Sequence, residues 1–222
     1  MDRMEAMQCR HSVRQYEERP VSEEDAAALR AEIEECNRES GLRIQLITKE
    51  PKAFSGFRAH YGSFSGVTDY IALVGKKSRD LDEKCGYYGE RIVLRAQELG
   101  LNTCWVALTY QKVPGAYECG KGEKLCIVIS LGYGKTQGVA HRSKMPTEVS
   151  EYAGARPEWF KRGVEAALLA PTAVNQQQFF LRGEGNTVRA AAKPGPCSKI
   201  DLGIVKYHFE LGAGQDSFVW KD

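Results

Sequence analysis

The sequence predicts a layered domain of the α/β or α+β class. Predicted strands and helices are interleaved along most of the chain, which is the pattern of such folds. With 222 residues, the chain can form one large domain or two small ones and can bury a sizeable core. Its composition, 42% hydrophobic and 27% charged residues, is typical of soluble globular proteins.

The first predicted helix begins after Ser22, whose side chain can cap the N–H groups of the first turn. Apolar residues then recur at helical spacing, and Gly41 suits the left-handed conformation that ends a helix. The alternating residues 42–48 predict a strand. Residues 51–66, rich in Gly, Ser and aromatics, predict a loop or a short irregular segment, and residues 69–74 predict a second strand.

The strongest helical pattern covers residues 80–100, where apolar side chains form one broad face. Residues 102–108 and 124–131 predict two further strands. A connector with Pro and Gly follows at residues 146–157, and Pro157 stands where the first residue of a helix is expected.

The remaining residues predict a helix, a hairpin and a last helix. The helix covers residues 159–170, and residues 178–182 and 187–192 flank a Gly-containing turn that predicts a β-hairpin. The last helix runs from about residue 199 to residue 211.

Two stretches of the chain resemble each other. Residues 89–105 and 203–220 each combine a helix with Gly near its start, a Leu-Gly pair and a short segment ending in Trp. A helix followed by a strand also opens each half of the chain. We therefore predict an internal duplication, with halves at residues 1–145 and 146–222.

Charge and hydropathy exclude some classes of function. The chain has 31 Lys and Arg against 29 Asp and Glu, whereas nucleic-acid-binding proteins carry a clustered basic excess. The longest apolar run, residues 125–131, is far shorter than the ~20 residues of a membrane span. The N-terminus lacks the apolar segment of a signal peptide, so we expect a cytoplasmic protein.

The cysteines and histidines show no spacing typical of a metal or redox site. The seven cysteines include no C-x-x-C pair, and the four histidines show no ligand spacing. We expect no metal ion, and cysteines that are reduced and mostly buried. Cys119, in a Gly-rich stretch, has no role that the sequence assigns.

A first polar cluster lies near the N-terminus. Arg10, Ser12 and Arg14 alternate, so in an extended segment their side chains point to one side. Guanidinium groups bind phosphate through paired, charge-assisted hydrogen bonds, so the cluster fits an anionic phosphate. On spacing alone, a solvated basic arm is the simpler explanation.

A second polar cluster covers residues 170–178, between an apolar helix and a strand that begins with Phe179. Its amides and hydroxyl are neutral donors and acceptors, the groups that orient a heteroaromatic ligand. Considered alone, this cluster is better explained as a helix cap and a polar turn.

Four segments together resemble the FMN-dependent nitroreductase superfamily, and its divergent, internally duplicated subgroup in particular. The R-x-S-x-R motif and the capped acidic helix after it resemble the start of its members, and residues 171–177 resemble its P-S-x-x-N-x-Q segment. Residues 99–106 resemble its L-G-L-x-T-C-W-I segment, and residues 130–134 resemble its I-G-Y-P turn. The resemblance implies an α+β fold, a three-layer α/β/α sandwich whose mixed, mostly antiparallel sheets are flanked by helices.

The resemblance also implies an FMN site. The residues implied at the phosphate and ribityl oxygens are Arg10, Ser12 and Arg14, with Arg142 or Lys144 as a second phosphate cation. The residues implied at the isoalloxazine are Thr172, Asn175 and Gln177. His11, Gly132 and Pro171 lie inside the matching motifs and are further implied cofactor-binding residues. No protein side chain is expected to be catalytic, because the flavin carries the chemistry. The family more often has Arg where His11 stands.

The order of the motifs departs from the family. The P-S-x-x-N-x-Q segment usually follows the first helix, but here it lies in the second half, which in turn has no R-x-S-x-R match. In typical members the two classes of contact come from different subunits of a homodimer. We therefore expect a single-chain pseudo-dimer with one FMN site, and a homodimer is the alternative.

The function that the resemblance implies is that of an FMN-dependent oxidoreductase. NADH or NADPH would reduce the bound flavin, which would pass electrons to a small-molecule acceptor such as a nitroaromatic or a quinone. The alternative is an FMN-binding protein of the same fold without nitroreductase turnover, for flavin storage, remodelling or redox sensing.

Overall fold

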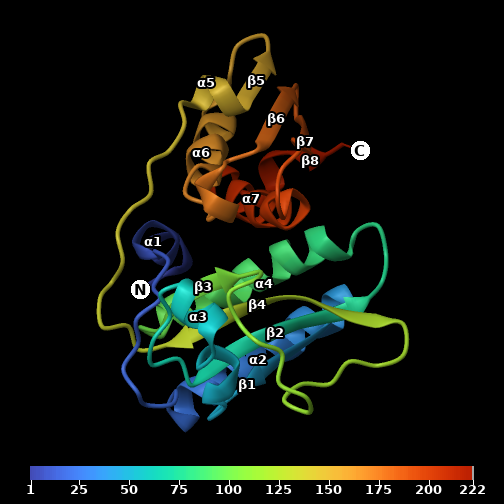
Figure 1. Ribbon diagram of the computed structural model, residues 1–222. Helices are drawn as coiled ribbons and strands as arrows, with labels where there is room; N and C mark the ends of the chain where they lie inside the picture. Colours follow the sequence, from blue (N-terminus) through green and yellow to red (C-terminus); the bar gives the residue numbers. More distant parts are fainter. Residues whose placement is uncertain (222) are drawn as a thin grey trace. The chain divides into compact units, whose positions relative to one another are not determined.

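The computed structural model describes residues 1–221 and divides the chain into two compact units (Figure 1). Unit 1 contains residues 1–81 and 91–140, and unit 2 contains residues 82–90 together with the described residues from 141 on. Helix α4 (Leu81–Glu98) therefore contributes residues to both units. The duplication into two related halves remains a prediction.

Unit 1 contains an antiparallel sheet in the order β1-β2-β4-β3. Its strands are β1 (Arg43–Ile47), β2 (Asp69–Lys76), β3 (Asn102–Val106) and β4 (Glu123–Gly132). Every residue of β2 except the last is buried, because the strand lies inside the sheet and both of its faces are covered. The four strands predicted in this part of the sequence are confirmed to within two residues at each end.

Two further helices of unit 1 lie N-terminal to this sheet in the chain: α1 (Arg3–Cys9) and α2 (Glu23–Ser40). The predicted start and end of α2 are confirmed. The Ser22 hydroxyl accepts a hydrogen bond from the Asp25 N–H at 3.1 Å, and Gly41 adopts a φ of 71°.

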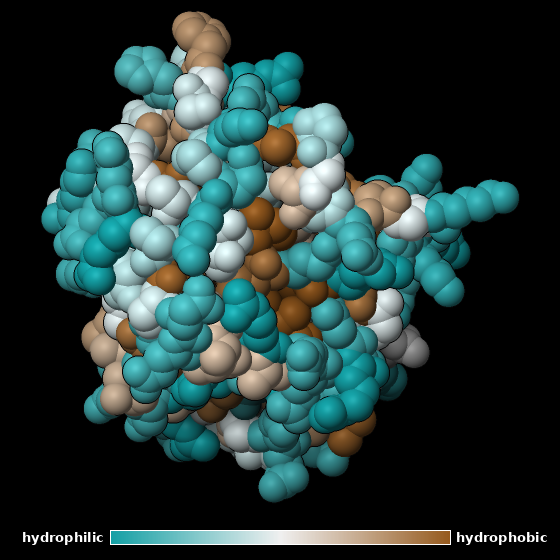
Figure 2. All heavy atoms as spheres, turned by 90° about the horizontal axis from the view of Figure 1, so that it is seen from below, coloured by the Kyte–Doolittle hydropathy of each residue, from teal (hydrophilic) through white to brown (hydrophobic). Residues whose placement is uncertain are grey.

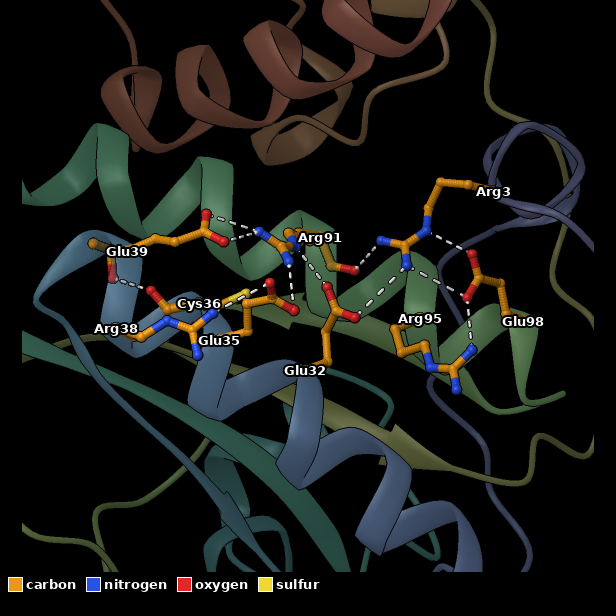
Figure 3. Close-up of polar contacts among 10 residues, drawn as sticks. Arg3, Glu32, Glu35, Cys36, Arg38, Glu39, Arg91, Arg95 and Glu98 are labelled. Carbon is orange, nitrogen blue, oxygen red and sulfur yellow. Dashed lines mark hydrogen bonds and ion pairs between the residues drawn. The ribbon is translucent and has the colours of Figure 1, made fainter.

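A network of ion pairs joins α1, α2 and α4 within unit 1 (Figure 3). Arg91 of α4 donates to Glu32 at 2.6 Å and to Glu39 at 2.9 Å, both on α2. Arg3 of α1 donates to Glu98 near the end of α4. Because several of these groups are partly buried, the shared pairing offsets the cost of removing their charges from water.

An aromatic core also packs against the sheet of unit 1. Residues 51–66 were predicted as a loop or irregular segment, and they form two short helices, η1 (Pro51–Phe54) and α3 (Phe57–Tyr61). The ring of Phe54 lies 5.2 Å from that of Phe64 and 5.9 Å from that of Tyr70 on β2. These buried rings attach η1 and α3 to the sheet.

Unit 2 contains a second sheet, in the order β5-β6-β7-β8. Its strands are β5 (Ser150–Ala153), β6 (Phe179–Glu184), β7 (Thr187–Ala192) and β8 (Val219–Trp220). Strands β6 and β7 pair antiparallel and confirm the predicted hairpin, whereas β5 and β8 pair parallel to their neighbours. The predicted α+β fold with mixed, mainly antiparallel sheets is therefore confirmed.

The helical elements of unit 2 are α5 (Pro146–Val149), α6 (Glu158–Ala167), η2 (Ala173–Asn175), α7 (Ser198–Ala213) and η3 (Gln215–Ser217). Pro157, predicted as the first residue of a helix, is instead the N-cap of α6. Helix α7 packs against α6, β6 and β7 and is largely buried.

Within unit 2, the first half of α4 packs closely on α7. A Cβ atom at Gly86 would lie 2.0 Å from the Ile200 carbonyl oxygen, and one at Gly203 would lie 2.0 Å from that of Glu83. Farther along, fully buried His208 of α7 places Nε2 2.9 Å from a carboxylate oxygen of Glu90, which is also fully buried. Two glycines and one buried polar pair thus fix the contact between these helices.

Several short elements were not predicted, and the burial of the cysteines differs from the expectation. Helix α1, strand β8 and the short helices η2 and η3 were not predicted. Helix α5 and strand β5 lie inside the predicted connector. Of the seven cysteines, only Cys36, Cys85 and Cys104 are buried, so the expectation that most are buried is wrong. Cys119 is exposed.

Candidate functional site

The R-x-S-x-R segment lies beside β3, at the edge of the sheet of unit 1. Ser12 forms a parallel β-bridge with Thr103, and the Val13 N–H donates to the Thr103 carbonyl at 3.0 Å. Val13 is buried, whereas Ser12 and Arg14 are exposed, as expected for alternating residues of an extended segment. Arg10 is the C-cap of α1 and is 3% exposed, so α1 delivers one of the two guanidinium groups into the protein.

The side chains of this segment converge on Cys104 of β3. Burial raises the pKa of the Cys104 thiol, while the charge of Arg14, a hydrogen bond with Ser12 and the charge of Arg10 act in the opposite direction. The two guanidinium groups and the hydroxyl therefore act on the same buried thiol. Two permanent cations and a hydroxyl are a donor set suited to a phosphate.

Residues 132–138 support the segment from another side. A Cβ atom at Gly132 would lie 3.1 Å from the ring of Tyr16, so a glycine there allows Tyr16 to pack onto the end of β4. The Tyr16 hydroxyl donates to the Val13 carbonyl at 2.6 Å. A Cβ atom at Gly138 would lie 2.8 Å from the Cβ of half-buried His11. The segment is therefore held between β3 and the chain that follows β4.

The second polar cluster forms a strained loop, residues 172–177, in unit 2. Three of its residues that are not glycine have positive φ: 46° at Val174, 54° at Asn175 and 47° at Gln177. Such left-handed conformations cost free energy and persist where surrounding contacts impose them. The side chain of Val174 is 88% exposed, so the loop presents an apolar group to its surroundings.

Most of the polar side chains of this loop form hydrogen bonds within unit 2. Asn175 and Gln177 each donate a side-chain N–H to the Arg142 carbonyl at 2.9 Å, and the Gln177 carbonyl oxygen Oε1 accepts from the Lys144 N–H at 2.8 Å. The Thr172 hydroxyl accepts from the Gln177 N–H at 3.0 Å. These hydrogen bonds fix the loop against residues 142–144, and no local pattern in the sequence indicates them.

Asp201, in the first turn of α7, anchors the same loop. It is 3% exposed and accepts hydrogen bonds from the Ala173 N–H at 3.0 Å and from the Gln176 side-chain amide at 2.7 Å. Burial raises the pKa of Asp201 to about 6, although both hydrogen bonds act in the opposite direction. Nothing in the sequence marks Asp201, because its partners lie more than 20 residues away.

The two basic residues implied as phosphate cations differ in their surroundings. The Lys144 ammonium donates to the Gln176 carbonyl at 2.9 Å and to the Gln177 carbonyl at 3.1 Å. The residue Arg142 is exposed, and its carbonyl is the one that accepts from the loop. Both residues belong to unit 2, whereas the R-x-S-x-R segment belongs to unit 1.

Two further findings concern the chain from residue 1 to residue 221. No helix in this range has both the length and the apolar character needed to cross a membrane. In the same range, no group of three or more His, Cys, Asp and Glu side chains is arranged to hold a metal ion.

The two sheets and their helices form a nitroreductase-like α+β fold. Comparison with known proteins also identifies the family. The family model described as "Putative TM nitroreductase" matches residues 2–213. The chain therefore belongs to this nitroreductase family. The search of curated proteins gave no match.

Solved structures agree with this assignment. A structure described as a putative nitroreductase from Thermotoga maritima is 25% identical, covers 97% of this chain and 85% of that chain, and has a TM-score of 0.67. A structure described as a putative NADH dehydrogenase/NAD(P)H nitroreductase from Parabacteroides distasonis is 20% identical, covers 66% and 95% of the two chains, and has a TM-score of 0.50. The first is similar over nearly the whole chain, and the second supports the fold alone.

Proposed function

We propose that the protein is an FMN-dependent oxidoreductase of the cytoplasm. In this proposal NADH or NADPH reduces the flavin, and a small acceptor such as a nitroaromatic or a quinone is reduced in turn. The observation that carries the proposal is the position of Arg10, Ser12 and Arg14 on a segment held beside β3, in a chain of the nitroreductase family. When bound, FMN would supply the hydride and electron transfer that no cluster of side chains here offers.

Each motif residue has a distinct part in this proposal. Arg14 and Ser12 are exposed and would donate hydrogen bonds to phosphate oxygens, while buried Arg10 would add a second fixed positive charge. Because β3 and Tyr16 already hold the segment extended, little ordering would be needed on binding. His11 and Gly132 would act by packing around the R-x-S-x-R segment and so fixing its shape.

The loop at 172–177 would contact the isoalloxazine. We infer that Thr172, Asn175 and Gln177 act mainly by holding the loop, since their side chains are hydrogen-bonded inside unit 2. Pro171 fixes the chain entering the loop. Arg142, the exposed one of the two basic residues, is the better candidate for the second phosphate cation, because the Lys144 ammonium already bonds two carbonyls.

The turnover part of the proposal is tested with FMN-loaded protein. We expect NADH or NADPH to bleach the flavin absorbance and a nitro compound or quinone to restore it. Absence of bleaching by both nucleotides, with FMN still bound, would contradict the oxidoreductase. It would instead favour an FMN-binding protein without turnover.

A further inference from the structure

Unit 2 contains a small cavity near the end of α7. Its volume is about 210 Å³, and its lining residues are Glu210, Gln215, Phe218 and Trp220. These residues belong to α7, η3, β8 and the position before β8, so the cavity lies within one unit. Sites for drug-sized ligands typically measure ~300–1,000 Å³. This cavity can therefore take only a small group.

Two aromatic rings at right angles line this cavity. The rings of Phe218 and Trp220 lie 5.0 Å apart at 89°. Both rings pack on Phe209, and Phe218 also stacks on Trp159 at 5.7 Å, so their positions are fixed before any ligand binds. The faces of aromatic rings attract cations, and the Lys206 ammonium already lies 5.4 Å from the centre of the Trp220 ring.

Glu210 supplies a carboxylate to the lining of the same cavity. One of its oxygens accepts a hydrogen bond from the Tyr87 hydroxyl, and the other accepts from the Trp220 indole N–H at 2.7 Å. Burial and the hydrogen bond with Glu210 raise the pKa of Tyr87, so the phenol keeps its proton. Both donors are therefore neutral, and neither cancels the charge of the carboxylate.

The charged groups around the cavity leave a negative balance. Lys206 pairs with Glu83, so Glu83, Lys206 and Glu210 together carry one negative charge. Asp216 and Lys221 are the charged residues of the described chain after α7, and their charges cancel. The balance favours a ligand with one positive charge.

The hydrogen bonds of the lining favour a quaternary ammonium group over a primary one. A primary ammonium has three N–H groups that need acceptors. Both Glu210 oxygens already accept a hydrogen bond, and the other side-chain acceptor among the described lining residues is the Gln215 amide. A quaternary ammonium has no N–H, and aromatic surface and negative charge suffice to bind it.

Exposed apolar surface alone does not show which charge a ligand carries. Figure 2 shows one face of the molecule, where apolar side chains in a hollow are surrounded by hydrophilic ones. The cavity of unit 2 is more specific, because two aromatic rings and a carboxylate lie together in its lining.

We propose that this cavity binds a small, free quaternary ammonium compound. The methylated head group lies against the rings of Phe218 and Trp220, and its positive charge lies near Glu210. The inference does not depend on FMN, because the residues that carry it lie outside the R-x-S-x-R segment and loop 172–177.

Titrations of the full chain with choline, followed through the Trp220 indole N–H signal in NMR spectra, test the class of ligand. We expect a saturable shift with choline. Binding of 3,3-dimethyl-1-butanol, which has the same shape without the charge, and of ethanolamine, a primary ammonium, should each be at least about tenfold weaker. No saturable shift, or equal binding of either comparison compound, would overturn the proposal.

The same spectra report the place of binding. Trp220→Phe identifies the Trp220 signal by its loss. Trp105 lies on β3 in unit 1 and is the internal control, so its indole signal should not move with choline. Equal shifts of the Trp105 and Trp220 signals would contradict binding in this cavity.

A charge-removing variant tests the part of Glu210. Glu210→Gln keeps a side-chain acceptor and should weaken choline binding about tenfold. Glu165→Gln, which removes an equal charge from an exposed position of α6 outside the cavity, should bind choline like wild type. Unchanged binding by Glu210→Gln, or an equal loss in both variants, would overturn the proposal. If Glu210→Gln does not fold, the comparison of the three compounds on wild type still decides.

Vesicles of phosphatidylcholine, which carry the same head group on a lipid, distinguish the source of the ligand. We expect the protein to stay in the supernatant when such vesicles are sedimented, because one small cavity contacts a single head group and stable membrane binding takes more than one signal. Sedimentation with the vesicles would overturn a free compound as the ligand.

Discussion

Asp201 is a buried carboxylate that accepts hydrogen bonds from the backbone and a side chain of one loop. Its partners, the Ala173 N–H and the Gln176 amide, belong to the loop with three positive-φ residues. Gln176 also donates to the Pro196 carbonyl at 2.7 Å, so the anchor extends to the chain entering α7. At the scale of single residues, the hydrogen bonds of Asp201 and Gln176 hold loop 172–177 in its strained conformation.

Asp201 should make the stability of the protein depend on pH. The folded protein releases the Asp201 proton near pH 6, whereas an ordinary Asp releases it near 3.8. Protonated Asp201 therefore favours the folded protein. This contribution to the free energy of unfolding is fully present below pH 3.8 and is lost as the pH rises through 6, a loss of about 3 kcal/mol at most. Denaturant unfolding at pH 4 and pH 7 measures it: wild type should lose stability relative to Asp201→Asn between these pH values.

The Asp201→Asn variant keeps one acceptor for the Ala173 N–H and removes the titration, so the difference between the two proteins isolates this group. A difference in unfolding free energy that is the same at pH 4 and pH 7 would show that Asp201 has an ordinary pKa.

At the scale of elements, the contact between α4 and α7 in unit 2 depends on glycine. Gly86 and Gly203 let the two backbones approach so closely that any Cβ atom would overlap a carbonyl oxygen. The pair of Glu90 and His208 continues this contact. His208 Nδ1 lies 3.1 Å from the Ala166 carbonyl, which can only accept, so Nδ1 carries a proton.

Gly86→Ala should destabilise unit 2. Its Cβ atom would meet the Ile200 carbonyl at 2.0 Å, and a backbone oxygen cannot move aside as a flexible side chain can. The gain in helix propensity, at most ~1 kcal/mol, is smaller than the expected strain of about 1–3 kcal/mol or more. Thermal unfolding should show a lower midpoint, and an unchanged or higher midpoint would mean that the helices are not in this contact.

The long elements were predictable because local signals specify them. Helices α2 and α4 have periodic apolar faces, and Ser22 and Gly41 mark the ends of α2. Strand β8 has only two residues, and β5 pairs in parallel with a strand about 30 residues away, so neither has a local pattern. Short strands of this kind are stabilised by pairing with strands that are distant in the sequence, so the local sequence does not predict them.

The cofactor site stays a prediction, but part of its local geometry was predictable. Alternation predicts that Ser12 and Arg14 share one side, and both are exposed on the extended segment beside β3, whereas Arg10 is buried at the end of α1. The hydrogen bonds of Gln177 could not be foreseen, because their partners Arg142 and Lys144 lie more than 30 residues away. The convergence on Cys104 likewise requires the pairing with β3.

At the scale of the whole molecule, the two polar clusters that the motifs mark belong to different units. The R-x-S-x-R segment lies in unit 1, and loop 172–177 lies in unit 2. The single-chain pseudo-dimer, in which one chain supplies both classes of contact, stays a proposal.

Light scattering with flavin quantitation tests this single-chain arrangement. We expect a particle of one chain, 24.7 kDa, with about one FMN. A stable particle of twice that mass, whose FMN is lost when the two chains separate, would contradict the pseudo-dimer and support the homodimer.

The measurement that tests the central claim most directly is the dissociation constant of FMN for wild type and for Arg14→Ala, from flavin fluorescence quenching. Arg14 is exposed, so its removal should leave the fold intact, and the loss of a charge-assisted hydrogen bond, ~1.5–3 kcal/mol, should weaken FMN binding about 10- to 100-fold. Arg38→Ala, an exposed cation on α2, is the matched control and should bind FMN like wild type. If Arg14→Ala also binds FMN like wild type, the R-x-S-x-R segment does not hold the phosphate.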